Sequence, residues 1–410
     1  MKNNLKLALA LSLLQVAAID TFAQQSFPFV MPKEKPTFKI SKAMNRLYDD
    51  FEAVTPQDNE LYTNFRYSPI TGLDYHNDDG TVTRRDPSRI VKIDGIYYMW
   101  YTKRDTPTTF MGVEKSSETI PSVDWDLSDI AYATSKDGFN WTEQGIAVHR
   151  PNKPALGWRS VCTPDILVWK GKYYLYYQAF SETSGKRGDD CPVTMSYSDS
   201  PNGPWTPVNK IVIENGKPGE WDQYSIHDPQ PIVYKGKIYM YYKSDYNGQE
   251  NGGLIRSQGL AIADSPFGPF KKYENNPVVN SGHETQLFRF KEGIASIMAK
   301  DGNENNTIQY SPDGKNFKIA SICAMMPIAS GLCDPDAFTD TPYAHGITWG
   351  ICHYNLWGDH RRSILLRFDC DLSLDVNDPD MKKNDVPFSL EELYKRGLSA
   401  QQRKRILSGK

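Results

Sequence analysis

The hydrophobic and polar positions of this chain repeat in a unit that recurs five times. In each unit a short apolar strand is followed by a two-residue turn and an aromatic strand, as in DILVWKGKYYLYY (165–177) and QPIVYKGKIYMYY (230–242). Lys-Gly and Asp-Gly pairs suit tight hairpins. A third and a fourth strand complete each unit, and the fourth carries an aromatic residue: Trp141, Trp205, Phe270 or Phe317. Because repeats of about 40–60 residues with four strands are typical of β-propellers, we predict an all-β fold, a five-bladed β-propeller over residues 71–375.

The two ends of the chain show helical spacing instead. The predicted N-terminal helical extension covers residues 24–70, and within it SKAMNRLYDDFEAV (41–54) has Ser41 as a candidate N-cap. That helix would place three apolar residues on one face: Ala43, Leu47 and Phe51. The predicted C-terminal helical segment covers residues 376–410, with residues 389–409 as one helix capped by Ser389. These helices need a packing partner, which is either a second subunit or the chain's own propeller.

The first 23 residues have the pattern of a secretory signal peptide. Lys2 and Lys6 precede an apolar stretch from Leu7 to Ile19, and the predicted cut follows Ala23. No later run approaches the roughly 18 apolar residues of a membrane span. We therefore expect an exported protein, periplasmic or secreted, without a membrane span.

Charge and composition exclude some classes of function. The 410 residues carry a net charge of −3, so no basic excess is available to neutralise the phosphates of a nucleic acid. Aromatic residues are frequent at 12%, and flat rings stack well on sugar faces. The six cysteines form no CxxC pair, which argues against a zinc ribbon. Export permits disulfides, so Cys162 could pair with Cys191 and Cys323 with Cys333; buried free thiols are the alternative.

Carboxylates recur at the entrance to the first strand of the units, which in a propeller opens at one mouth of the central channel. The residues there are Asp86, Thr163 with Asp165, His227 with Asp228, His283 with Glu284, and Asp334 with Asp336. Like charges near one axis repel unless a cation, a proton or a substrate relieves them, so such a cluster indicates a functional site. Glycoside hydrolysis needs facing carboxylates, one to protonate the leaving oxygen and one to activate water or attack the sugar. The alternatives are turn capping by single Asp residues and a structural cation.

Four stretches of the chain resemble glycoside hydrolase family 117. SKAMNR (41–46) looks like that family's SxAxxR motif, RRDP (84–87) and HDPQP (227–231) look like its first two catalytic stretches, and GHET (282–285) looks like the third. The resemblance implies an enzyme that removes 3,6-anhydro-L-galactose from the non-reducing end of neoagaro-oligosaccharides, cutting an α-1,3 bond with inversion. It also implies a homodimer formed through the terminal helical segments.

The resemblance implies a role for each matching residue. Asp86 would be the general base that activates water, and His283 the general acid, with Asp228 and Glu284 around the sugar. The rival assignment gives the proton to Glu284, kept protonated by repulsion from Asp228. Residues that would contact the substrate are Trp125, Thr163, Gln178 and His227, with His353, His360 and Arg361 reaching the leaving sugar. No cofactor is required, and a divalent cation near the carboxylates is compatible with the sequence although no spacing demands one.

Two other functions stay open at this point. A furanosidase or arabinosidase of the wider propeller group would use Asp86, Asp228 and Glu284, but the SxAxxR segment and the histidine before Glu284 argue against it. A non-enzymatic glycan-binding propeller would not need several ionised carboxylates at one mouth. Loss of turnover on replacement of Asp86 would separate an enzyme from such a binding protein.

Overall fold

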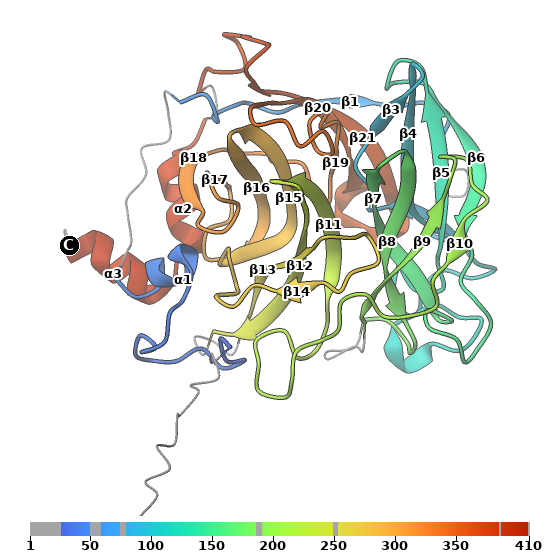
Figure 1. Ribbon diagram of the computed structural model, residues 1–410, viewed down its shortest axis with the longest axis horizontal. Helices are drawn as coiled ribbons and strands as arrows, with labels where there is room; N and C mark the ends of the chain where they lie inside the picture. The colour runs from blue at the N-terminus through green and yellow to red at the C-terminus, as the bar shows by residue number, and fades with distance from the viewer. Residues whose placement is uncertain are drawn as a thin grey trace, which may run out of the picture.

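β-Sheets make up the body of the molecule. The computed structural model describes residues 26–49, 59–73, 79–185, 191–248, 253–384 and 387–408, so the predicted signal peptide lies outside the described residues. The α-helices of this part of the chain, α1 (Lys42–Arg46), α2 (Leu390–Gly397) and α3 (Ala400–Ser408), gather on one side of the sheets (Figure 1). None of the described helices is long and apolar enough to cross a membrane.

Three antiparallel sheets follow the chain in order. The first contains β2 (Val82–Arg85), β3 (Val91–Ile93), β4 (Ile96–Asp105), β5 (Asp129–Ser135) and β6 (Trp141–Val148). The second contains β7 (Ser160–Trp169), β8 (Lys172–Phe180), β9 (Val193–Ser198) and β10 (Thr206–Pro207). The third contains β11 (His227–Tyr234), β12 (Lys237–Asn247), β13 (Leu254–Ala263) and β14 (Lys271–Lys272). Each sheet thus corresponds to one unit of the sequence repeat.

The remaining strands form one eight-stranded sheet. They are β15 (Ser281–Lys291), β16 (Gly293–Gly302), β17 (Thr307–Ser311), β18 (Lys318–Ile322), β19 (Gly331–Leu332), β20 (Ala344–Asn355), β21 (Ser363–Ser373) and β1 (Arg66–Pro69). β15 to β18 correspond to the fourth unit, and β19 to β21 correspond to the fifth, with β1 paired to β21 at the edge. Pairing at Phe290 and Lys291 joins β15 to β20, so two units share this sheet. The all-β fold is confirmed, and the number of blades stays a prediction.

The hairpin turns have the backbone that their sequences predict. Both residues of each turn have a positive φ, between 50° and 84°, at Asp94-Gly95, Lys170-Gly171 and Lys235-Gly236. This is the type I′ geometry, whose twist matches that of the flanking strands. The strands pair in register up to each turn.

Aromatic side chains join consecutive units. In three units the aromatic residue just before the fourth strand packs edge to face on an aromatic residue in the second strand of the preceding unit. The pairs are Trp205 with Trp100, Phe270 with Tyr176, and Phe317 with Tyr241, at ring-centre distances of 5.8, 5.9 and 6.2 Å. Trp141 of the first unit lies in one buried cluster with Trp349 of β20, so the first unit also contacts the fifth.

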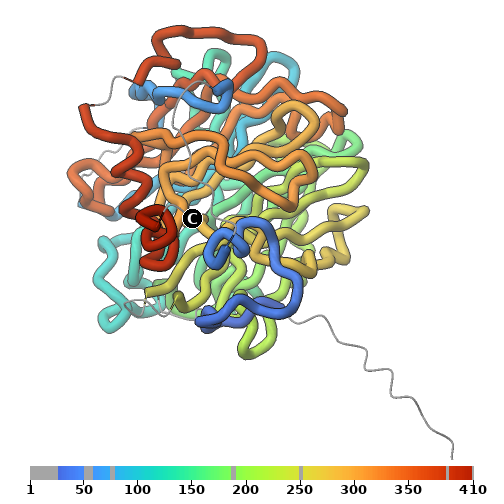
Figure 2. Tube along the Cα trace, turned by 90° about the vertical axis from the view of Figure 1, so that its left-hand side faces the viewer, coloured from blue at the N-terminus to red at the C-terminus, as the bar shows by residue number. Residues whose placement is uncertain are grey.

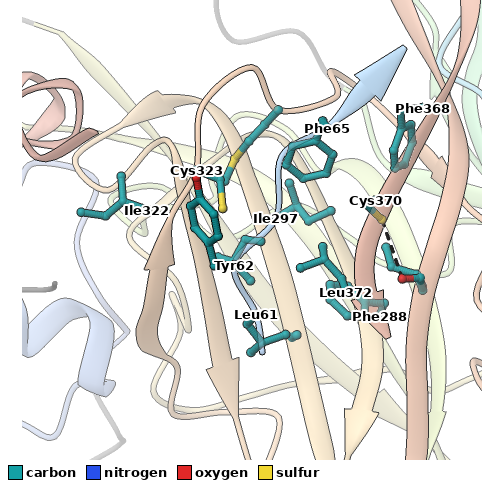
Figure 3. Packing of buried hydrophobic residues seen from close by; sticks show 14 of the residues in the cluster. Leu61, Tyr62, Phe65, Phe288, Ile297, Ile322, Cys323, Phe368, Cys370 and Leu372 are labelled. Carbon is teal, nitrogen blue, oxygen red and sulfur yellow. Dashed lines mark hydrogen bonds between the residues drawn. The ribbon is translucent and has the colours of Figure 1, made fainter. Parts of the chain in front are cut away.

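One large apolar cluster joins the segment before β1 and the C-terminal helices to the eight-stranded sheet. Figure 3 shows part of this cluster, with Leu61 and Tyr62 beside residues of the sheet. Its sheet residues include Phe288, Ile297 and Phe368, and the segment before β1 adds Leu61 and Tyr62. The C-terminal helical segment adds three further buried residues: Leu390, Tyr394 and Leu398. Figure 2 shows the same arrangement from the side, with the N-terminal segment and the C-terminal helices close together. In the described residues these helices therefore pack on the chain's own sheets, and the homodimer stays a prediction.

The SxAxxR segment is anchored by hydrogen bonds. Ser41 caps α1 by accepting from the Met44 N–H, as predicted, and its hydroxyl donates to the carbonyl of Pro277. Arg46 is buried and donates to Glu304 through Nε and Nη2, each at 2.8 Å. The motif therefore attaches α1 to the fourth unit. The helix is shorter than the predicted residues 41–54, because α1 ends at Arg46 and Leu47 is its C-cap. Phe51, predicted on the same helix, lies outside the described residues.

Three sequence expectations need correction. The C-terminal segment is two helices, because α2 ends at Gly397, a residue that favours helix termination, and α3 begins at Ala400. Ser389 caps α2 as predicted. Residues 66–69, assigned to the helical extension, are strand β1, so the sheets begin before residue 71. All six cysteines are free thiols, so the two proposed pairs are wrong and the alternative of unpaired thiols holds.

Candidate active site

Five residues with a left-handed backbone mark equivalent positions of the five units. They are Asp86, Thr163, Asp228, Glu284 and Ala329, with φ between 43° and 60°. All five line one cavity of 30 Å³. For a residue other than glycine this conformation costs on the order of 1–3 kcal/mol, and such strain concentrates at functional sites.

The left-handed residue explains why neighbouring polar side chains share one cavity. In a regular strand the side chains of neighbours point to opposite faces. The positive φ breaks this alternation, and both members of three pairs line a larger cavity of 520 Å³: Arg85 with Asp86, His227 with Asp228, and His283 with Glu284. Nε2 of His283 accordingly lies 3.3 Å from Oε1 of Glu284.

A third position in each unit completes the site. It lies near the end of the second strand, opposite the residue that directly precedes the left-handed one. The residues there are Thr102, Gln178, Lys243, Lys300 and His353. Four of them line the cavity of 520 Å³, and Thr102 accepts a hydrogen bond from the Thr163 N–H at 2.7 Å. Sequence reasoning noticed Gln178 and His353 but missed Lys243 and Lys300, which an alignment of the five second strands would have revealed.

The four residues predicted around the reacting sugar and the four first-named substrate contacts all line this larger cavity. They are Asp86, Asp228, His283, Glu284, Trp125, Thr163, Gln178 and His227. Its other lining residues are Arg85, Phe180, Lys243, Lys300, Ile328, His353, Tyr354, Asn355, Gly358 and His360. The roles of these residues stay predictions, but their assembly in one place is a property of the fold.

The fifth unit departs from the predicted register. Asp334 and Asp336 were expected at the channel mouth, but Ala329 has the equivalent backbone and lines the smaller cavity. Asp334 is buried and accepts from Arg89 Nη1 at 3.2 Å, and Asp336 accepts from the His345 N–H at 2.8 Å. The fifth unit therefore begins before its CDPD stretch, and these two carboxylates play a structural part.

Asp86 is buried among three partners. Its carboxylate lies 2.7 Å from Arg85 Nε and 3.1 Å from His353 Nδ1, and Thr163 Oγ1 donates to it at 3.4 Å. Burial alone would raise the pKa of Asp86, but the Arg85 guanidinium and His353 outweigh burial and lower the pKa below its usual value. Asp86 is therefore ionised at neutral pH.

Arg85 links Asp86 to a second buried carboxylate. Its Nη1 donates to Asp124 Oδ2, and its guanidinium lies 5.0 Å from the ring centre of Trp125. His360 Nδ1 lies 3.1 Å from the same Asp124 carboxylate, which raises the pKa of His360 by a hydrogen bond. Arg361 is different, since it pairs with Asp359 and does not line the cavity.

Asp228 has its own cation. Lys243 Nζ lies 2.7 Å from Asp228 Oδ2, and although burial would raise the pKa of Asp228, Lys243 lowers it. Gln178 Oε1 accepts from the Asp228 N–H at 3.2 Å, so Gln178 holds this turn in place. Burial is the main cause that lowers the pKa of His227 to about 3, so its ring is neutral. The Asp228 carboxylate is therefore paired with a cation inside the cavity.

Two carboxylates of the cavity lie beside protein cations. Arg85 pairs with Asp86, and Lys243 pairs with Asp228. Within the described ranges no group of three or more His, Cys, Asp or Glu residues could hold a metal ion. Two of the three carboxylates that line the cavity, Asp86 and Asp228, therefore have a protein cation beside them, and the divalent cation stays a prediction.

Comparisons with known proteins agree with this geometry. Residues 119–257 match the model of glycosyl hydrolases family 43. The solved structure of Zg3597, a family 117 glycoside hydrolase produced by the marine bacterium Zobellia galactanivorans, is 55% identical, covers 82% of this chain and 98% of that chain, and has a TM-score of 0.76.

A more distant solved structure shares the fold alone. It is described as a glycoside hydrolase, with 12% identity, coverage of 80% of this chain and 96% of that chain, and a TM-score of 0.55. No curated protein matches the chain. Sequence identity of 55% over most of both chains, together with the shared propeller-like fold, shows that this chain belongs to glycoside hydrolase family 117.

Proposed function

We propose that this protein is an exo-acting, inverting glycoside hydrolase that releases 3,6-anhydro-L-galactose from the non-reducing end of neoagaro-oligosaccharides. Family membership supports glycoside hydrolysis, and the motifs in SKAMNR, RRDP, HDPQP and GHET support this substrate. The observation that carries the proposal is a buried carboxylate held ionised, Asp86, in the same cavity as the imidazole of His283.

The proposed reaction uses two proton transfers. Asp86 takes a proton from water while the water oxygen bonds to the anomeric carbon and the glycosidic C–O bond breaks. Nε2 of His283 gives its proton to the leaving oxygen, which departs as an alcohol. Both groups then return to their starting states by exchanging one proton through solvent. Glu284 and Asp228 orient the sugar in this scheme.

The surroundings of Asp86 and His283 suit the proposed roles of general base and general acid. A general base must be deprotonated before the reaction, and the Arg85 guanidinium keeps Asp86 ionised. A general acid must reach the substrate, and His283 has a side chain that is 24% exposed within the cavity. Glu284 is the rival acid, and its distance of 3.3 Å from His283 makes the two groups interact.

The first test is hydrolysis of neoagarobiose by the protein without residues 1–23. We expect release of 3,6-anhydro-L-galactose, and proton NMR early in the reaction should show the anomer opposite to that in the substrate. Asp86→Asn and His283→Ala should each lower kcat by about 10²–10⁴-fold. Matched controls are Asp264→Asn and His149→Ala, whose side chains are 81% and 76% exposed, and both should retain activity.

Other outcomes would point elsewhere. Retained activity in His283→Ala with loss in Glu284→Gln would make Glu284 the acid. A wild-type protein that does not cleave neoagarobiose but cleaves an arabinofuranoside would be a furanosidase. Binding of the sugar without cleavage of either substrate would indicate a glycan-binding protein.

The remaining organisation is part of the same proposal. Five equivalent left-handed residues around one small cavity support five blades. A signal peptide at residues 1–23 would export the protein to the periplasm or medium. The homodimer would form through the terminal helical segments, and light scattering of the purified protein measures its mass directly.

A further inference from the structure

His283 is held from the side opposite Glu284. Its Nδ1 lies 2.7 Å from Oδ2 of Asp301, and its Nε2 lies 3.3 Å from Oε1 of Glu284. The two ring nitrogens therefore face different partners, and only Nε2 is directed to a residue that lines the cavity. No sequence motif pointed to Asp301.

Backbone geometry brings Asp301 to this position. β15 and β16 pair His283 with Lys300, so Asp301 follows directly after the cross-strand partner of the histidine. Asp301 itself has a left-handed backbone, with φ 55°, and precedes Gly302. As with Glu284, a residue other than glycine occupies a costly conformation where its side chain meets His283.

We propose that Asp301 is a positioning residue for the proton transfer: it accepts a hydrogen bond from Nδ1–H of His283 and so directs Nε2 toward the leaving oxygen. A carboxylate at one ring nitrogen fixes the tautomer and the ring orientation, and it stabilises the protonated imidazole. This inference rests on the proposed function, since it gives His283 the role of general acid.

Several charged groups surround the pair. Arg256 Nη1 lies 3.8 Å from Asp301 Oδ2, and Lys300 and Arg256 both act on Asp301 electrostatically. His283 is its strongest influence, because their hydrogen bond lowers the pKa of Asp301 below its usual value. Asp301 is therefore ionised at neutral pH.

On the cavity side, the imidazole faces further charges. Glu284 is the direct contact, and the Asp228 carboxylate, the neutral ring of His227 and the Lys243 ammonium lie beyond it. Since Lys243 pairs with Asp228, the carboxylates left to stabilise a protonated His283 are Asp301 and Glu284. Removing the charge of Asp301 should thus take away one of the two carboxylates that contact the imidazole.

The experiment compares wild type with Asp301→Asn, Asp301→Ala and Asp301→Glu, and uses Asp264→Asn as the matched surface control. We expect kcat on neoagarobiose to fall about 10-fold to 100-fold in the Asn and Ala variants, less than the roughly 10²–10⁴-fold cost of losing a general acid. The alkaline limb of the kcat–pH profile should move to lower pH in both, and Asp301→Glu should restore part of it. Asp264→Asn should change neither.

A second readout does not depend on activity. Nitrogen-15 NMR of labelled histidine should show His283 with its proton on Nδ1 in the neutral ring of wild type, and a changed tautomer population in Asp301→Ala. Asp301→Asn keeps the size of the side chain, so the same nitrogen shifts are measured in this variant if Asp301→Ala does not fold.

The outcomes separate the two proposals. An unchanged pH profile with unchanged nitrogen shifts in Asp301→Asn would overturn the role of Asp301 while leaving the glycosidase intact. A wild type inactive on neoagarobiose would overturn the proposed function, and the nitrogen shifts would still report whether Asp301 orients the ring. Full activity of His283→Ala would overturn the catalytic part of this inference.

Discussion

Replacement of Glu304 by Gln tests whether one buried ion pair holds the SxAxxR segment to the sheets. The side chains of Glu304 and Arg46 are 0% and 5% exposed, and two hydrogen bonds of 2.8 Å join them. Glu304 also accepts from Gln309 Nε2 at 2.9 Å. The Gln variant keeps the size of the side chain but leaves the guanidinium buried without its carboxylate.

The expected cost is large. Breaking a buried pair by removing one partner costs about 3–5 kcal/mol, because the remaining charge stays in a poorly solvated place. An exposed pair on the same segment provides the control: Lys35 and Asp49 are 41% and 56% exposed, and Asp49→Asn should cost less than about 1 kcal/mol. Urea unfolding followed by tryptophan fluorescence measures both values at constant m-value.

A double variant sharpens the interpretation. Arg46→Met combined with Glu304→Leu removes both charges and fills the site with apolar atoms, so it should be more stable than either single variant. A cost for Glu304→Gln as small as that for Asp49→Asn would refute the argument, since the pair would then contribute nothing to the attachment of α1.

Two further predictions concern charge in the cavity. Lys243→Met removes the cation that lowers the pKa of Asp228, so the acid limb of kcat/KM should move to higher pH; Lys237→Met, in the same hairpin but at an exposed pair, should leave the profile unchanged. The folded-state pKa of His227, about 3, lies below the roughly 6.5 of an unfolded histidine, so between these values only the unfolded chain binds this proton and stability falls as pH falls. Urea unfolding from pH 6.5 to 4 should show a slope smaller by about 1.4 kcal/mol per pH unit in His227→Gln, and equal slopes would contradict the neutral buried ring.

Local patterns predicted the strands, turns and helix caps. The Lys-Gly turns follow from residues that accept a positive φ, and Ser41 and Ser389 cap helices because their hydroxyls reach nearby N–H groups. These features depend on a few neighbouring residues, so the sequence carries them directly. Three of the four motif stretches, RRDP, HDPQP and GHET, supply five of the predicted site residues, and all five line one cavity: Asp86, His227, Asp228, His283 and Glu284.

Long-range features were harder to predict. Lys243 and Lys300 become part of the site only through cross-strand pairing, and Asp301 only through a left-handed backbone. In the fifth unit the equivalent residue is Ala329, whose side chain has no ionisable group. The acidic CDPD stretch was therefore predicted at the channel mouth in its place. Gly397 did signal the break between α2 and α3, since glycine favours helix ends, but the continuous helical pattern outweighed it.

The pairing of β1 with β21 has a consequence for how the chain folds. Arg66 pairs with Asp369, so β1 can form its ladder only after β21, the last strand of the sheets, has been synthesised. Closing a loop of this length costs on the order of 5 kcal/mol of chain entropy, and four residues of strand can offset that cost only when the sheets between them are already in place. We therefore expect β1 to pair late. Until then the edge of β21 that faces away from β20 is unpaired. Because the two strands are far apart in the sequence, we expect their pairing to be a slow final step of folding.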